Sequence, residues 1–302
     1  MFRHLVVPLD GSREANVAVP HAYRMARGSG SDASVTLLRV VSHGRDVAAA
    51  QAFLDGVAHE HAAADLAVDG VVREGDPAHV ILAEVRQRGA DLVVMRTHGR
   101  SGLARAVLGS VAERIVKQSP TPVLLLPPGE RTEAPGAIRS ILVPVDGSPG
   151  GSLALGIAQE LARQSAASLQ LLQVVQPVPP YQSSALLMYG PVDVRPAWDE
   201  DSHAAAQAHV EALASRLMAR GLAAQSEALS ANSVPEAIVA NAREHACDLI
   251  VMSSHAHTGA ARTFVGSVTD AVVRSAHCPV LVIRRDAEAE SQPVETATNP
   301  PN

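Results

Sequence analysis

The chain has 302 residues, a formal net charge of −6, and 47% apolar but only 2% aromatic residues, so we expect two domains of about 150 residues each. The acidic balance argues against nucleic acid as a partner, because phosphate backbones need a basic face and bases need aromatic platforms. No apolar run reaches the roughly 18 residues of a membrane span, no signal peptide precedes the first apolar run, and Cys247 and Cys278 give no disulfide framework, which together predict a cytoplasmic protein without a membrane partner.

The first half of the chain alternates apolar runs with helix-like segments. Strands are predicted at residues 2–9, 35–41, 70–74, 91–95 and 122–126. Ser12 is the predicted N-cap of a helix of about fifteen residues that Pro20 should kink. A second helix is predicted at 47–66, and Asp76-Pro77 should start a third, with Asp as cap and Pro at the first helical position. Apolar strands alternating with helices predict a parallel sheet with helices on both faces.

A glycine-bearing loop follows the fourth strand and ends at Gly109-Ser110. Ser110 is the predicted N-cap of the next helix, with Glu113 completing a capping box. Strand, glycine loop and helix start form an anion site, because glycines let a ligand approach the backbone and the first helical N–H groups are free. Ligands of such sheets bind outside the carboxyl ends of strands, so Asp10 after the first strand should face this loop and accept a hydrogen bond from a sugar hydroxyl or a base amine.

The pattern restarts after a Pro- and Gly-containing linker, which indicates duplication of a whole domain. Arg3–Ser12 returns as Arg139–Ser148, Asp91–Met95 as Asp248–Met252, and Gly109–Val111 as Gly266–Val268. We therefore predict domains at 1–127 and 139–285, a linker at 128–138 and a disordered tail at 286–302. The second copy carries an insertion at 177–196, either a lid over the ligand crevice or an ordinary surface loop.

The last strands of the two halves, 122–126 and 279–283, should each lie at the edge of their own sheet. Because exposed apolar edges are a liability, we expect the halves to pack through these strands around a pseudo-twofold axis. Further dimerisation of the chain is left open.

The loop motif identifies a family. The first half reads Arg96-Thr97-His98-Gly99, nine residues, then Gly109-Ser110, and the second reads Ser253-Ser254-His255-Ala256, nine residues, then Gly266-Ser267. Both halves resemble the tandem form of the universal stress protein family, whose ATP-binding pattern is Gly-x2-Gly-x9-Gly-Ser/Thr. The first half has Arg96 at the first glycine, and the second half lacks both early glycines.

The resemblance implies two tandem Rossmann-like α/β domains of the adenine nucleotide alpha hydrolase-like type, each a five-stranded parallel sheet of order 3-2-1-4-5. It also implies an ATP site between the ends of the first and fourth strands, with Mg²⁺ held through the phosphates. From the residues themselves we predict no protein metal ligands and no catalytic residues. Carried over by position, the nucleotide-binding residues are Pro8, Leu9, Asp10, Val41, Met95, Arg96, Gly99, Gly109, Ser110 and Val111 in the first half, the more complete site, and Pro144, Val145, Asp146, Val175, Met252, Gly266, Ser267 and Val268 in the second.

These features predict an ATP-binding regulatory protein of the stress-response type. Two alternatives stay open: a nucleotide-free interaction scaffold, and a slow ATPase, although no base for water is evident in the loop. Arg96 either recognises phosphate or fills ribose space, and the loop glycines could serve packing alone. The pairs His59-x-His61 and His255-x-His257 are weak metal candidates: the first lies in a predicted helix, where residues two apart do not face one another, and the second lies in the loop.

Overall fold

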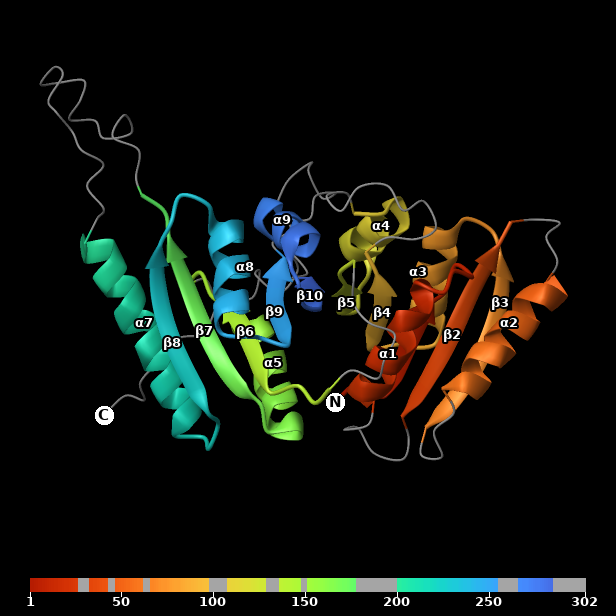
Figure 1. Ribbon diagram of the computed structural model, residues 1–302, viewed down its shortest axis with the longest axis horizontal. Coiled ribbons are helices and arrows are strands. Elements are labelled where there is room, and N and C mark those ends of the chain that lie inside the picture. The colour runs from red at the N-terminus through yellow and green to blue at the C-terminus, as the bar shows by residue number, and fades with distance from the viewer. Residues whose placement is uncertain are drawn as a thin grey trace, which may run out of the picture.

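The strands that the structure describes form a ten-stranded sheet. The computed structural model describes residues 1–26, 33–42, 47–61, 66–97, 108–128, 136–147, 151–177, 200–254 and 266–284. The sheet order is β3-β2-β1-β4-β5-β10-β9-β6-β7-β8 (Figure 1), so each half has the order 3-2-1-4-5 that the resemblance implies. The strands are β1 (His4–Pro8), β2 (Ser34–Val41), β3 (Ala67–Glu74), β4 (Leu92–Arg96), β5 (Val123–Leu126), β6 (Ser140–Pro144), β7 (Ser168–Val175), β8 (Ala224–Ser230), β9 (Leu249–Ser254) and β10 (Val280–Arg284).

Helices cover both faces of this sheet, as predicted. They are α1 (Ala18–Ala26), α2 (Val47–Glu60), α3 (Pro77–Gln87), α4 (Ser110–Gln118), α5 (Gly151–Ser165), α7 (Glu200–Met218), α8 (Val234–Glu244) and α9 (Ser267–Ser275). One core packs under α1, α2, α5 and α7, and the other under α3, α4, α8 and α9. Adjacent residues of a strand point to opposite faces of the sheet and so pack into different cores. In β2, Leu37 lies in the first core and Leu38 in the second. Both cores contain residues of both halves, so burial of apolar surface joins the two domains.

The two halves meet through an antiparallel pairing of β5 with β10. Leu124 lies opposite Leu281, and the flanking pairs are Val123 with Val282 and Leu125 with Val280. The predicted pairing of the last strands is therefore confirmed, and neither β5 nor β10 is an edge of the final sheet. The edges are instead β3 and β8, whose exposed and polar residues suit an edge position.

Several local boundaries differ from the sequence prediction. The first helix opens with a 3₁₀ turn, η1 (Ala15–Val17), in which the Ser12 hydroxyl accepts a hydrogen bond from the Ala15 amide at 3.2 Å. Pro20 then falls in the first turn of α1, directly after η1, and proline is tolerated better in a first turn than in a helix interior. Helix α2 ends at Glu60 rather than at residue 66. Strand β3 begins at Ala67, three residues before the predicted start, because it pairs along the whole length of β2.

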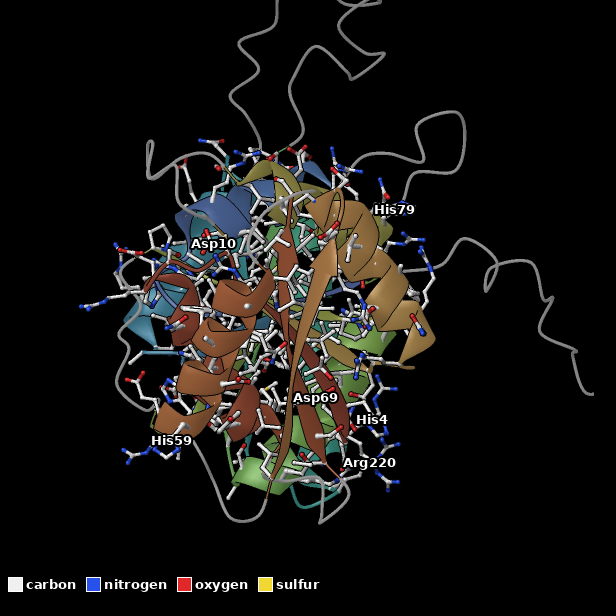
Figure 2. All side chains as sticks on the ribbon, turned by 90° about the vertical axis from the view of Figure 1, so that its right-hand side faces the viewer. His4, Asp10, His59, Asp69, His79 and Arg220 are labelled. Atoms are coloured by element: carbon white, nitrogen blue, oxygen red, sulfur yellow. The ribbon has the colours of Figure 1, made fainter. Side chains whose placement is uncertain are left out.

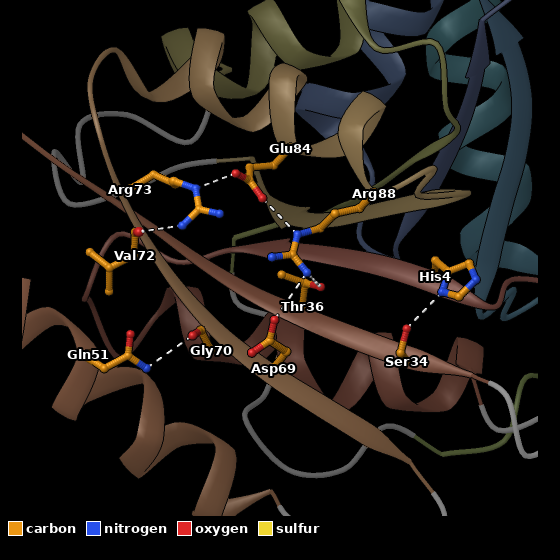
Figure 3. A network of polar contacts seen from close by, with 10 residues as sticks. All are labelled: His4, Ser34, Thr36, Gln51, Asp69, Gly70, Val72, Arg73, Glu84 and Arg88. Atoms are coloured by element: carbon orange, nitrogen blue, oxygen red, sulfur yellow. Dashed lines mark hydrogen bonds and ion pairs between the residues drawn. The ribbon is translucent and has the colours of Figure 1, made fainter.

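A buried carboxylate fastens the edge strand β3 to helix α3 (Figure 3). The Glu84 side chain is 5% exposed and accepts hydrogen bonds from Arg73 Nε at 2.6 Å and Arg88 Nε at 2.9 Å. Arg88 also reaches Thr36 on β2 and Asp69 on β3. Burial alone would raise the pKa of Glu84, but the hydrogen bonds from Arg88 and Arg73 hold this pKa below its usual value.

We expect Glu84→Gln to lower the free energy of unfolding by about 1–2 kcal/mol at pH 7, because it removes the charge but leaves two partly exposed arginines. Since the pKa of Glu84 is lower in the folded than in the unfolded state, its contribution is complete above about pH 5 and is lost as the pH falls through the folded pKa. Urea denaturation at several pH values measures this. The control Glu160→Gln, in an exposed pair with Arg163, should change stability by less than about 0.5 kcal/mol.

Residues 1–128 and 136–302, expressed separately, should each self-associate or bind one another, because each exposes an apolar strand that is paired in the whole chain. Sedimentation of the single and mixed halves checks this. Halves that stay monomeric and stable would contradict the role assigned to the β5–β10 pairing.

Candidate functional site

A cavity of about 370 Å³ opens at the carboxyl ends of β1, β2 and β4, beside the amino ends of α3 and α4. Its volume falls within the range of small-molecule sites, roughly 300–1,000 Å³, and β1 and β4 are the neighbours at which the strand order reverses. Figure 2 shows Asp10 and His79 at this upper end of the molecule, whereas His4 and Asp69 lie toward the opposite end. The lining residues are Pro8, Leu9, Asp10, Ala15, Leu38, Val40, Pro77, Ile81, Met95, Arg96, Thr97, Gly109, Ser110, Val111 and Ala112.

The turn after β1 forms one wall. The Leu9 amide donates to the Leu38 carbonyl at 2.8 Å, and Asp10 Oδ1 accepts hydrogen bonds from both the amide and the hydroxyl of Ser12. Gly11 has φ +87°, a conformation that favours glycine. A side chain at Gly11 would also collide with the Arg39 guanidinium, which lies 4.9 Å from the centre of the Phe53 ring.

Thr97 fixes the opposite wall by joining the end of β4 to the start of α4. Its amide and hydroxyl both donate to the Leu126 carbonyl, at 3.1 and 3.2 Å. Its own carbonyl accepts the Gly109 amide at 2.8 Å. Residues 98–107, which include the predicted site residue Gly99, lie outside the described part of the chain. The positions on either side of this segment are thus held by one backbone hydrogen bond.

Gly109, not Ser110, is the N-cap of α4. The Glu113 amide donates to the Gly109 carbonyl at 2.8 Å, and no side chain caps the helix. The predicted capping box is therefore wrong, because the bond to Thr97 holds Gly109 at the cap and the Glu113 carboxylate pairs instead with Lys117 Nζ at 2.6 Å. The amides of Ser110, Val111 and Ala112 precede this first helical bond, have no intrahelical acceptor and are available to an anion.

Helix α3 contributes the cavity rim, and its predicted start is confirmed. Asp76 is the N-cap and accepts the His79 amide at 3.0 Å, with Pro77 as the first helical residue. Arg114 of α4 lies 3.0 Å from the Asp76 carboxylate and so links the two helices. The hydrogen bond from the His79 amide and the one from Arg114 lower the pKa of Asp76 below its ordinary value.

The structure brings most of the predicted first-half residues around this one cavity: Pro8, Leu9, Asp10, Met95, Arg96, Gly109, Ser110 and Val111. Val41 is not among the lining residues, because alternate residues of a strand face opposite sides and it is Val40 that shares a face with Leu38. The sequence prediction missed Leu38, Pro77 and Ile81. The period-2 pattern of β2 could have indicated Leu38, but only the tertiary packing of α3 brings Pro77 and Ile81 to the cavity.

The second half repeats the same scaffold. The Val145 amide donates to the Leu172 carbonyl at 2.8 Å, as Leu9 does to Leu38, and Gly266 caps α9 with no side-chain hydrogen bond. Gly147 has φ +74° in the turn after β6. The predicted second-half residues stand at the corresponding strand ends and helix start: Pro144, Val145, Asp146, Val175, Met252, Gly266, Ser267 and Val268.

The histidine pairs and the two cysteines were the other candidates for a functional site. The His61 ring packs edge-on against Tyr23, with ring centres 6.4 Å apart. Within the described ranges, no group of three or more His, Cys, Asp or Glu residues could hold a metal ion, and no helix is both long and apolar enough to cross a membrane. His255 and His257 lie outside the described residues. Cys247 and Cys278 are both buried and unbridged.

This chain is similar to several proteins that are described as universal stress proteins. The model of the Universal stress protein family matches residues 1–127 and 137–284. A universal stress protein of Methanocaldococcus jannaschii is 31% identical over 142 residues, which cover 42% of this chain and 82% of the relative. One from Mycobacterium bovis is 27% identical over 210 residues, 67% of this chain and 61% of that protein. The crystal structure of a universal stress protein from Archaeoglobus fulgidus shares the fold, with TM-score 0.65 and 19% identity over 94% of this chain and 97% of that one.

The turn that carries Asp10 gives a stability prediction. We expect Gly11→Ala to lower the free energy of unfolding by about 1–2 kcal/mol, because a left-handed backbone is costly for a residue with a Cβ. Gly56→Ala is the matched control: Gly56 lies within α2, where an added Cβ meets nothing within 4 Å, so it should raise stability by about 0.5–1 kcal/mol. Changes of the same sign in urea denaturation would contradict the assigned conformation of the turn.

Proposed function

The chain belongs to the universal stress protein family, and from that premise and the cavity we propose that its first half binds ATP as a regulatory ligand in a stress response. The observation that supports this most directly is the composition of the cavity. It combines an apolar compartment at the strand ends with the amino terminus of α4, so one ligand with a flat apolar base and an anionic tail would satisfy both.

The residues present fit an adenine nucleotide. Leu38, Val40, Ile81 and Met95 would enclose the adenine, and Asp10 would accept a hydrogen bond from a ribose hydroxyl or the adenine amine. The amides of Ser110 and Val111 would hold the phosphates. Gly109 has φ −59° and ψ 142°, a conformation open to every residue type, so the backbone does not require glycine at this position. A close approach of a phosphate group to the backbone would account for the presence of glycine at position 109. Mg²⁺ would be held through the phosphates and would neutralise part of their charge.

We favour ligand binding over hydrolysis as the function of this cavity. Asp10 is the carboxylate among the described lining residues, and its Oδ1 already accepts two hydrogen bonds from Ser12. It is therefore poorly placed to activate water. Binding itself would stabilise the folded state, by about 2.7 kcal/mol when the free ligand is at 100 times its Kd.

Helix α4 offers a route by which occupancy could act on the other half. Its amino end lines the cavity, and at its carboxyl end the Lys117 carbonyl accepts a hydrogen bond from Arg284 of β10 at 2.7 Å. Ligand binding at the amino end would therefore favour one position of a helix that is bonded to the second half. We propose that such a bias changes the contacts of the chain with its partners.

Two assays separate this proposal from its alternatives. Equilibrium dialysis of the nucleotide-stripped protein should show ATP binding, and absence of binding at millimolar ATP would favour a nucleotide-free interaction scaffold. A phosphate-release assay on the loaded protein should show no turnover above the protein-free rate. Sustained release of phosphate that Gly109→Val abolishes would instead identify a slow ATPase.

We expect Gly109→Val to weaken ATP binding by at least about tenfold, because overpacking a closely fitted site costs about 1–3 kcal/mol. The control Gly136→Val changes a position where an added Cβ meets nothing within 4 Å, and should leave the affinity unchanged. Dialysis with labelled ATP measures both, and thermal unfolding checks that each variant folds. An unchanged affinity of the Gly109 variant would contradict the placement of the phosphates.

A further inference from the structure

Toward the residues that the structure describes, Arg96 uses one side of its guanidinium. Its Nη1 donates to the Glu14 backbone carbonyl at 3.2 Å, which ties the end of β4 to the turn before η1. Its Nε is buried and has no hydrogen-bond partner among the described residues. A buried donor without an acceptor is costly, so this atom is a group that a ligand oxygen would satisfy.

The unused side of Arg96 is the one suited to an anion. In a guanidinium, Nε–H and one N–H of Nη2 point the same way and form a planar fork that matches two oxygens of a phosphate or a carboxylate. The bond from Nη1 to Glu14 occupies the other side and restricts the plane of the group. Arg96 therefore lines the cavity with its position partly fixed before a ligand arrives.

The charge of Arg96 is not balanced by an ion pair with any residue in the described ranges. Most side chains that share the cavity lining are apolar, so water and counter-ions are partly excluded. The amino terminus of α4 faces the same cavity and also favours negative charge. Two independent anion-binding groups, one from β4 and one from α4, therefore border one space.

We propose that Arg96 binds a phosphate group of the nucleotide, so that the first half selects nucleotides over the uncharged nucleoside. This inference rests on the proposed function and assigns its selectivity to one side chain. The position in the second half equivalent to Arg96 is Ser253 in β9, which carries no charge. Selectivity for charge is then a property of the first half, and the two halves of the duplicated chain differ in the ligands that they retain.

The test compares ATP with adenosine on the full-length protein. We expect Arg96→Ser, which introduces the residue of the second half, to weaken ATP binding by about 10- to 100-fold, the range for a lost hydrogen-bonded charge. Adenosine affinity should stay within about twofold, because the nucleoside carries no phosphate. Arg96→Lys keeps the charge without the fork and should lose less than Arg96→Ser. Arg220→Ser, an exposed site far from the cavity in Figure 2, makes the same change in net charge and should leave both affinities unchanged.

The outcomes separate this inference from the proposed function. If Arg96→Ser leaves ATP affinity unchanged, or strengthens it because the guanidinium had filled ligand space, the role of Arg96 is overturned while nucleotide binding stands. Equal losses for ATP and adenosine would show that Arg96 only supports the fold, and would also overturn it. If the wild-type protein binds neither compound, the proposed function fails, and this inference fails with it.

Discussion

Backbone hydrogen bonding between β5 and β10 turns two five-stranded sheets into one. Each of these strands is short, apolar and terminal in its own half, so each would otherwise expose unpaired N–H and C=O groups along an apolar edge. Pairing Leu124 with Leu281 removes both edges at once and lets the two apolar cores run unbroken across the boundary. The halves therefore fold as one molecule, with polar edge strands, β3 and β8, left at its two ends.

The same pairing places β10 of the second half next to α4, the helix that lines the cavity. Helix α4 lies between the cavity and β10, with its amino end in the lining and its last turn bonded to Arg284. The hydrogen bonds that Arg274 of α9 donates to the Asp270 carboxylate raise the pKa of Arg274, and the nearby charge of Glu113 of α4 adds a smaller contribution. A ligand that shifted α4 would therefore also change the contacts that α4 makes with Arg284 and Arg274 of the second half.

Duplication has kept the backbone of the site and changed its side chains. The bonds Leu9–Leu38 and Val145–Leu172 have equal lengths, and both following turns contain a glycine with positive φ. The polar residues differ: Arg39 of β2 corresponds to Gln173 of β7, whose amide oxygen is bonded to His209, and Arg96 corresponds to Ser253. Among the described residues at this end of the sheet, the first half therefore has two arginines where the second half has uncharged Gln173 and Ser253.

Local chemistry in the sequence determined the alternation of strands and helices, the duplication, the Asp76-Pro77 helix start and the apolar edges that pair. Each of these features depends on neighbouring residues or on a repeated pattern, so each can be predicted from the sequence. The tertiary structure alone decided that Gly109 rather than Ser110 caps α4, because the carbonyl that holds it belongs to Thr97 across the loop. It also decided that Ile81 reaches the cavity and that the Glu14 carbonyl takes up one side of Arg96. These are contacts between distant segments, whose geometry depends on how whole elements pack.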